Sequence, residues 1–224
     1  MAGLNIKQTD INTIIFDFDG TLAKLNIDFQ QMHESIEKHI LSYGIKRDGL
    51  HSKFVLEMIE TAKAILINQM PHQADTFLNE ANAIIENIEI EAASTGELFE
   101  HTKELLKYLD AVDISCGIIT RNCNKAVKIV FPEILSYCAV VICRDDVKRV
   151  KPHPEHITTA LEKLGSSAGN TLMIGDHPLD IKTGRNAGTK TCGVLTGHFQ
   201  KDAFLEAGAD IVLAQASDLL NIIK

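Results

Sequence analysis

Short apolar runs alternate with amphipathic segments along most of the chain. Six of these runs end at a turn or polar residue, and their almost continuous apolar character is typical of strands buried on both faces. In the segments between them, apolar residues recur every three or four positions, which predicts helices. This alternation predicts an α/β fold with a doubly wound, Rossmann-like parallel sheet. The predicted strands are 13–18, 114–120, 139–143, 171–174, 191–195 and 210–213, and the predicted helices are 102–109, 125–130, 154–164, 179–187, 202–207 and 217–223.

One long stretch interrupts this alternation. From about residue 27 to residue 93 the pattern contains only helical periodicity, for example at Met58, Ala62 and Leu66. Helix breakers at 44–49 and 68–71 divide it into three segments. A single strand-to-strand crossover does not need three helices. We therefore expect an inserted all-α domain at 25–94, within an α/β core formed by 1–24 and 95–224.

Charge and composition exclude several classes of protein. The 224 residues include 22 Lys and Arg and 30 Asp and Glu, so the formal net charge is 22 − 30 = −8. This balance argues against nucleic-acid and anionic-membrane partners, although a small anionic substrate remains compatible with it. No apolar run approaches the length of a membrane span, and no signal-peptide pattern is present. Five cysteines, several within apolar runs, indicate reduced thiols and a cytoplasmic setting.

The first predicted strand ends in an acidic pair, Asp17 and Asp19, followed by Gly20. Strand alternation would point both carboxylates the same way, toward the edge of the sheet where α/β proteins bind ligands. Two such carboxylates repel each other, and a hard cation such as Mg²⁺ relieves that repulsion. Alternatively, Asp-Gly is a common turn pair and could simply end the strand.

Polar residues also follow the later strands. Thr120, Arg121 and Asn122 come where a helix should begin, so a hydroxyl and free amides there suit a phosphate group. The same residue types are also good helix caps. Lys151 lies in a polar connection before Pro152, where a lone lysine is often simply solvated.

A second acidic pair, Asp176 and Asp180, follows the strand at 171–174, where either residue could instead cap the next helix. The four motifs are therefore an acidic pair, a threonine, a lysine and a second acidic pair, in that order. In this order and context the chain resembles the haloacid dehalogenase-like superfamily, on its phosphatase side. The helical insertion between the first two motifs resembles the C1-type cap of phosphoglycolate phosphatase and its relatives.

The resemblance implies a role for each motif residue. Asp17 would be the nucleophile that forms an aspartyl-phosphate, and Asp19 would be the general acid and base. Lys151 would neutralise charge on the nucleophile and the phosphoryl group. Thr120, Arg121, Asn122 through its backbone amide, and Lys151 would bind the phosphate group. Asp17, Asp176 and the backbone carbonyl of Asp19 would bind Mg²⁺. Asp180 would orient Lys151 or a metal-bound water.

These inferences predict a Mg²⁺-dependent phosphatase that hydrolyses a small phosphorylated metabolite. Loops of the cap would set specificity, and Lys46 and Arg47 are candidates for binding an acidic substrate group. A phosphosugar mutase of the same superfamily is the alternative enzyme. A non-enzymatic receiver-like phospho-switch is a further alternative, but a receiver is much shorter and carries its phosphorylated aspartate on a later strand.

Overall fold

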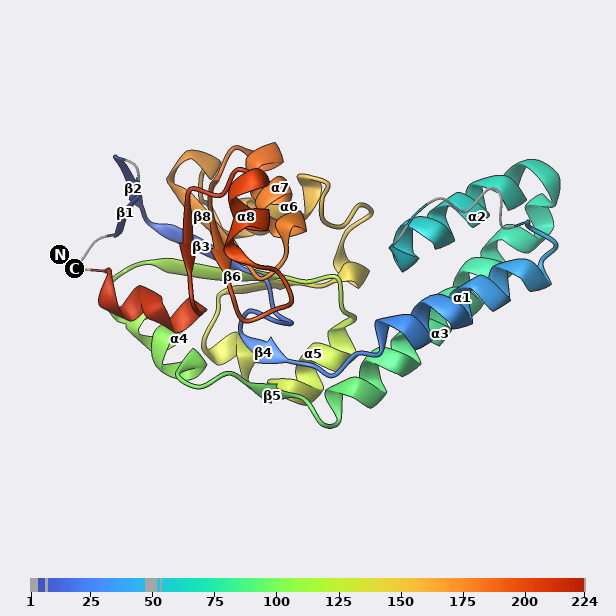
Figure 1. Ribbon diagram of the computed structural model, residues 1–224, viewed down its shortest axis with the longest axis horizontal. Helices are drawn as coiled ribbons and strands as arrows, with labels where there is room; N and C mark the ends of the chain where they lie inside the picture. The colour runs from blue at the N-terminus through green and yellow to red at the C-terminus, as the bar shows by residue number, and fades with distance from the viewer. Residues whose placement is uncertain (1–3, 7, 47–51, 53, 224) are drawn as a thin grey trace. The chain divides into compact units, whose positions relative to one another are not determined.

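Six parallel strands form the central sheet, in the spatial order β10-β9-β8-β3-β6-β7. Figure 1 labels three neighbouring strands of this sheet, β8, β3 and β6. The computed structural model describes residues 4–6, 8–46, 52 and 54–223. The apolar runs predicted as strands all lie in this sheet, which confirms the fold class. The strands are β3 (Thr13–Phe16), β6 (Ser115–Ile119), β7 (Val140–Ile142), β8 (Thr171–Gly175), β9 (Lys190–Val194) and β10 (Ile211–Leu213).

The first of these strands, β3, lies in the middle of the sheet. From β3 the chain adds β6 and β7 on one side, and then returns to the other side for β8, β9 and β10. Phe16, the last residue of β3, lies opposite Ile118 of β6 and Ile174 of β8. The carboxyl end of β3 is therefore the point where the order of strands reverses, which is where open α/β sheets bind their ligands.

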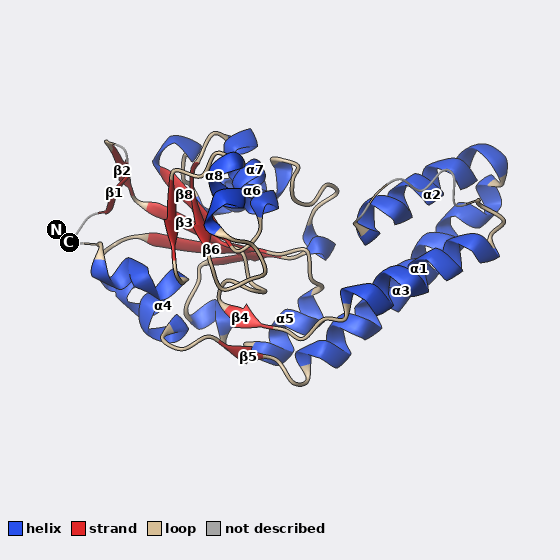
Figure 2. Ribbon diagram, in the orientation of Figure 1, coloured by secondary structure: helices blue, strands red, loops and turns tan. Residues whose placement is uncertain are grey.

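Helices cover the sheet on both faces (Figure 2). Helix α6 packs on β6 and β7, and α7 packs on β8 and β9. The buried face of α6, which includes Ile157, Ala160 and Leu161, lies in a cluster with residues of four strands. Helix α4 packs against β6 and against the C-terminal 3₁₀ segment η5, which replaces the α-helix predicted at 217–223. The helical elements of this unit are α4 (Thr102–Ala111), α5 (Asn124–Val130), η2 (Ile134–Ser136), η3 (Arg144–Asp146), α6 (Glu155–Leu164), η4 (Ala168–Asn170), α7 (Pro178–Ala187), α8 (Lys201–Glu206) and η5 (Ala216–Asn221).

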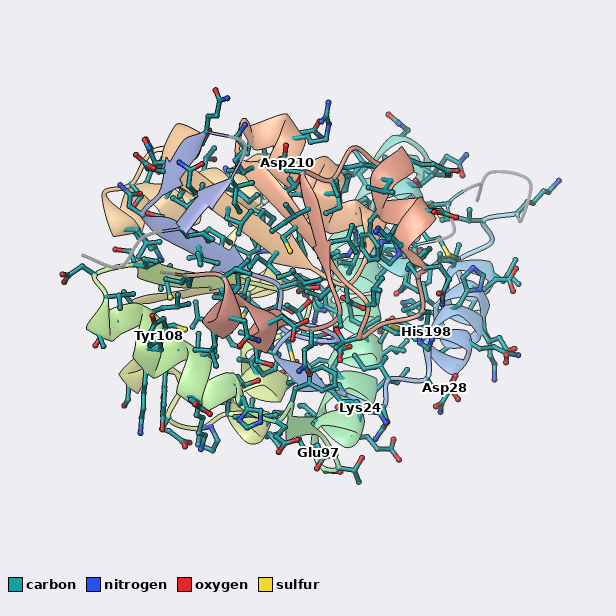
Figure 3. The ribbon with its side chains drawn as sticks, turned by 60° about the vertical axis from the view of Figure 1, so that its left-hand side comes forward. Lys24, Asp28, Glu97, Tyr108, His198 and Asp210 are labelled. Carbon is teal, nitrogen blue, oxygen red and sulfur yellow. The ribbon has the colours of Figure 1, made fainter. Side chains whose placement is uncertain are left out.

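Residues Asn26–Thr95 form a second compact unit made of three helices. These are α1 (Phe29–Ser42), α2 (Val55–Gln69) and α3 (Pro71–Ala93). Helix α1 begins after Asp28, whose Oδ1 accepts a hydrogen bond of 2.8 Å from the Gln31 amide (Figure 3). Apolar side chains at helical spacing, including Met58, Ala62 and Leu66, are buried in this unit. Lys46 is exposed, whereas Arg47 lies outside the described residues.

Four short strands were not predicted. Strands β1 (Leu4–Ile6) and β2 (Thr9–Ile11) pair with each other, as do β4 (Ala23–Lys24) and β5 (Glu97–Leu98). In the second pair Lys24 lies opposite Glu97, both labelled in Figure 3. The pair therefore brings together the two chain segments that flank the helical unit. Within the described ranges, no helix combines the length and apolar character needed to cross a membrane.

Candidate active site

Asp17 directly follows β3 and continues the pairing of the sheet. Its amide donates to the Ile174 carbonyl of β8 over 2.8 Å. Its side chain is buried, and Oδ1 accepts hydrogen bonds of 2.7 Å from the Phe18 amide and 2.7 Å from Lys151 Nζ. The end of the central strand thus holds one carboxylate in a fixed orientation beside a buried cation.

Asp19 lies in the turn that leaves the strand. Its Oδ1 accepts a hydrogen bond of 2.8 Å from the Leu25 amide, and the Gly20 amide donates to the Ala23 carbonyl over 2.7 Å. Strand β3 ends at Phe16, so strand alternation does not set the direction of the Asp19 side chain as the sequence pattern suggested. Gly20 adopts φ +80°, the left-handed region that glycine favours.

Asp176 follows β8 and lies between two glycines. A Cβ atom at Gly20 or at Gly197 would overlap the Asp176 carboxylate. Gly197 lies in the loop after β9, and the hydroxyl of its neighbour Thr196 donates to the Gly20 carbonyl. The turn at Gly20 and the loop at Gly197 therefore both approach the Asp176 carboxylate. The carboxylate has room between them only because neither glycine carries a side chain.

Lys151 and Asp180 form a buried ion pair beside this carboxylate. Lys151 Nζ donates to Asp180 Oδ1 over 2.7 Å, and both side chains are almost fully buried. Asp180 Oδ2 also accepts from the His177 amide at 3.1 Å, at the start of α7. Asp180 therefore completes the capping box of α7, whose N-terminal cap is His177, and also pairs with the Lys151 ammonium, so the two interpretations of its sequence position are compatible.

Three carboxylates converge at this site. One oxygen each from Asp17, Asp176 and Asp180 lies within 4.8 Å of the others, and the Asp19 side chain is not part of this group. Burial raises the pKa of Asp17 to about 7, with a further increase from Asp180 and an opposing effect of Lys151. Burial, followed by the charges of Asp17 and Asp180, raises the pKa of Asp176 to about 8.

The charges of the site do not cancel. Burial alone would lower the pKa of Lys151, but Asp17 and Asp180 outweigh it and keep this pKa above its usual value. When all three carboxyl groups are ionised, they and the one ammonium group leave −3 + 1 = −2 formal charges in the site. The oxygen donors and the residual charge fit a divalent cation that prefers oxygen ligands.

The loop after β6 contains the predicted phosphate-binding residues. Thr120 is buried, its amide donates to the Ile142 carbonyl over 3.0 Å, and its hydroxyl accepts from the Asn122 amide at 3.2 Å. The buried Asn122 Nδ2 has no hydrogen-bond partner in the part of the chain that the structure describes. Arg121 Nη1 donates to the Lys151 carbonyl over 2.7 Å, so the structure connects this loop to the lysine.

Two of the amides in the first turn of α5 already have hydrogen-bond partners within the fold. Helix α5 begins at Asn124, and its N-terminal cap is Cys123 rather than Thr120 or Asn122. The Asn124 amide donates to Asp145 Oδ2 over 2.9 Å, and the Ala126 amide donates to Cys123 Sγ over 3.4 Å. These amides are therefore already used within the fold.

Two features of the site were missed by the sequence reasoning. His156 was not assigned to the site, yet it is fully buried and its Nδ1 accepts a hydrogen bond of 3.2 Å from the Lys151 amide. The only signal in the sequence was its place on the apolar face of a predicted helix. The loop with Thr196 and Gly197 was not assigned to the site, because its approach to Gly20 depends on long-range packing.

The chain belongs to the haloacid dehalogenase-like hydrolase family, whose model matches residues 14–194. This result confirms the resemblance seen in the four motifs. Pyrophosphatase PpaX of Bacillus mycoides is 32% identical over 217 residues, covering 96% of this chain and 97% of the relative. N-acetylmuramic acid 6-phosphate phosphatase of Pseudomonas putida is 30% identical over 223 residues, covering 95% and 96%. A hydrolase from Pseudomonas syringae has the same fold, with a TM-score of 0.68 and 24% identity over 94% of this chain and 96% of that one.

Proposed function

We propose that this protein is a Mg²⁺-dependent phosphatase that hydrolyses a small phosphorylated metabolite through an aspartyl-phosphate on Asp17. The observation that carries the proposal is the buried Lys151 ammonium, which lies 2.7 Å from both Asp17 and Asp180 at the carboxyl end of the central strand. Such an arrangement presents an oriented carboxylate next to a cation that can stabilise the negative charge of a phosphoryl group.

Asp17, Asp176 and the backbone carbonyl of Asp19 would hold the metal ion. When bound, Mg²⁺ would neutralise charge on the phosphoryl oxygens. This assignment is supported by the oxygen donors and the negative charge of the three converging carboxylates. Asp180 would act through Lys151, which it holds by a direct ion pair.

The chain's residues divide the reaction into two displacements. A carboxylate oxygen of Asp17 forms a bond to phosphorus, the bond from phosphorus to the leaving oxygen breaks, and Asp19 gives that oxygen its proton. In the second step Asp19 takes a proton from a water molecule as the water attacks phosphorus. The bond between Asp17 and phosphorus then breaks, which releases phosphate and restores both carboxyl groups to their starting states.

Thr120 and Asn122 would bind the phosphoryl oxygens together with Lys151. The Asn122 amide is already bonded to Thr120 Oγ1. The Asn122 side chain is therefore the better donor for this role, because its buried Nδ2 lacks a partner among the described residues. A buried amide without a hydrogen bond is costly, and a phosphoryl oxygen would satisfy it.

The substrate panel follows from the relatives. PpaX is a pyrophosphatase, and the Pseudomonas putida relative is an N-acetylmuramic acid 6-phosphate phosphatase. Pyrophosphate and N-acetylmuramic acid 6-phosphate are therefore candidate substrates here. Phosphoglycolate belongs in the same panel, because the motifs and the helical insertion resemble those of phosphoglycolate phosphatase.

The test is release of inorganic phosphate from this panel, with MgCl₂ and then with EDTA, for wild type and Asp17→Asn. Release that needs the metal and disappears in Asp17→Asn would support the proposal. Absence of release from every compound would contradict it. Isomerisation of a phosphosugar in the presence of a bisphosphate activator would then favour the mutase alternative.

A further inference from the structure

Lys151 is held at both its backbone groups as well as at its ammonium group. Its amide donates to His156 Nδ1 over 3.2 Å, and its carbonyl accepts from Arg121 Nη1 at 2.7 Å. Its Nζ lies 2.7 Å from Asp17 Oδ1 and 2.7 Å from Asp180 Oδ1. The backbone of Lys151 is therefore fixed from two directions, by the side chains of His156 and Arg121.

His156 connects Lys151 to the neighbouring strand. It lies in the first turn of α6 with no exposed surface, and its Nε2 is 3.0 Å from the Ile142 carbonyl at the end of β7. The same carbonyl accepts from the Thr120 amide at 3.0 Å. A carbonyl has two lone pairs, so it can accept both bonds and join the lysine to the phosphate loop.

These partners require one tautomer of His156. Nδ1 accepts from an amide N–H, so it carries no proton, and Nε2 must carry the proton that it donates to a carbonyl. Burial, followed by the nearby charge of Lys151, lowers the pKa of His156 to about 3. The neutral ring therefore keeps its Nδ1 acceptor available near neutral pH.

Arg121 holds the opposite side of the lysine backbone. It lies between Thr120 and Asn122, and its own carbonyl accepts from Arg144 Nη1 at 3.0 Å. The Arg144 amide in turn donates to the Asn122 carbonyl over 3.2 Å. The loop that would bind phosphate and the lysine that would neutralise its charge are thus connected by a direct hydrogen bond of 2.7 Å, and Arg144 holds the loop through two more.

We propose that His156 and Arg121 are positioning residues, which fix the Lys151 backbone so that Nζ reaches Asp17 in register with the Thr120 loop. This inference rests on the proposed phosphatase function. A lysine side chain is long and flexible, so its head group is placed accurately only if its backbone is fixed. Misplacement of a reacting group by about 1 Å can reduce a rate on the order of a hundred-fold.

The test exploits the geometry of the two ring nitrogens. In His156→Asn the side-chain oxygen can take the place of Nδ1 and accept from the Lys151 amide. In His156→Gln the amide NH₂ can take the place of Nε2 and donate to Ile142, but nothing then accepts from Lys151. Both variants lose one of the two bonds, so a purely structural histidine predicts similar losses for the two.

We expect His156→Asn to retain kcat within about three-fold of wild type, and His156→Gln to lose at least about ten-fold, with KM changing much less. The substrate is whichever compound the panel identifies, and thermal unfolding of each variant is measured in parallel. The matched controls are His153→Asn and His153→Gln, because His153 Nδ1 accepts from the Glu155 amide instead of from Lys151. These controls should show no such difference in kcat.

Arg121 supplies a second, independent arm should His156→Gln fail to fold. Arg121→Met removes the donor to the Lys151 carbonyl, whereas Arg121→Lys keeps a cationic donor, so kcat should fall on the order of ten-fold in the first and recover in part in the second. Equal kcat values for His156→Asn and His156→Gln, or losses of kcat that merely parallel the losses of thermal stability, would overturn the inference. Either result would leave the phosphatase assignment intact. A wild-type protein without phosphatase activity would overturn both.

Discussion

Replacing Asp176 by Asn should stabilise the metal-free protein while removing one of the proposed metal ligands. Asn has nearly the same shape as Asp but carries no charge, so the change relieves the repulsion among the three closely spaced carboxylates of Asp17, Asp176 and Asp180. The pKa of Asp176 rises from 3.8 to about 8 in the folded protein, chiefly because of burial. The folded state therefore binds this proton more tightly than the unfolded state does.

The pH dependence follows from that difference. Between about pH 4 and pH 8 the folded state holds a proton on Asp176 that the unfolded state has released, so stability falls as pH rises through this range. A difference of about 4 units corresponds to a ceiling of about 6 kcal/mol at pH 8 and above. Relaxation and water entry should reduce it by about half, so we expect Asp176→Asn to gain about 3 kcal/mol, or about 6 to 12 °C in Tm.

The assay is urea or thermal unfolding in EDTA at pH 5 and pH 8, followed by the same measurements in MgCl₂. Asp176→Asn should be more stable than wild type at pH 8 in EDTA, with a much smaller advantage at pH 5. Added Mg²⁺ should stabilise wild type, by about 2.7 kcal/mol at a hundred times its Kd, and should stabilise the variant far less.

The contrasting variant is Asp180→Asn, which changes another of the three converging carboxylates. Asp180 accepts from Lys151 Nζ and from the His177 amide, so its replacement should destabilise the metal-free protein by about 2 kcal/mol. The opposite signs expected for Asp176 and Asp180 test the electrostatic reasoning directly. An Asp176→Asn protein that is less stable than wild type at pH 8 in EDTA would refute it.

Three further predictions concern the nucleophile, the loop after β9 and the buried histidine. Asp17→Asn should lower the rate of phosphate release by roughly three orders of magnitude or more, while its far-UV circular dichroism spectrum stays that of wild type. A smaller loss of rate would argue against a covalent role for Asp17. Gly197→Ala places a methyl group against the Asp176 carboxylate and should raise the Mg²⁺ concentration needed for half-maximal activity, whereas Gly169→Ala, which meets no atom within 4 Å, should not. The pKa of His156 is about 3 when folded and 6.5 in the unfolded reference, so stability should be lost as pH falls from about 6.5 toward 3, by up to about 5 kcal/mol. Calorimetry across that range should show a shallower loss for His156→Asn, and equal slopes would show that another group controls acid unfolding.

The strands of the sheet could be predicted because their burial on both faces leaves a local signal. Their ends are less predictable: the apolar pattern predicts a strand over 13–18, but β3 stops at Phe16 and the next residues turn into the site. Strands β4 and β5 have two residues each and exist because they pair with each other across the helical insertion. A pattern within one segment contains no information about such a partner.

The site was predictable as a list of residues because parallel strands bring their carboxyl ends to one edge of the sheet. This rule places Asp17, Asp176 and the Thr120 loop near one another without any knowledge of side chains. It does not say that Lys151, which comes from a loop, is shared between Asp17 and Asp180. That choice depends on where the loop backbone lies, and the sequence motif does not determine it.

Lys151 shows that a motif residue depends on its neighbours in space as well as on its own side chain. Lys151 and Pro152 can be recognised as a pair in the sequence, but the ammonium group is useful only if it reaches Asp17 at hydrogen-bond distance. Here that placement depends on His156, five residues later, and on Arg121, thirty residues earlier, and both act on main-chain atoms. Interactions with the main chain leave little trace in residue type, because many side chains can donate to a carbonyl or accept from an amide. The residues that position a catalytic group can therefore vary in identity while the group itself stays recognisable, and a structure is needed to find them.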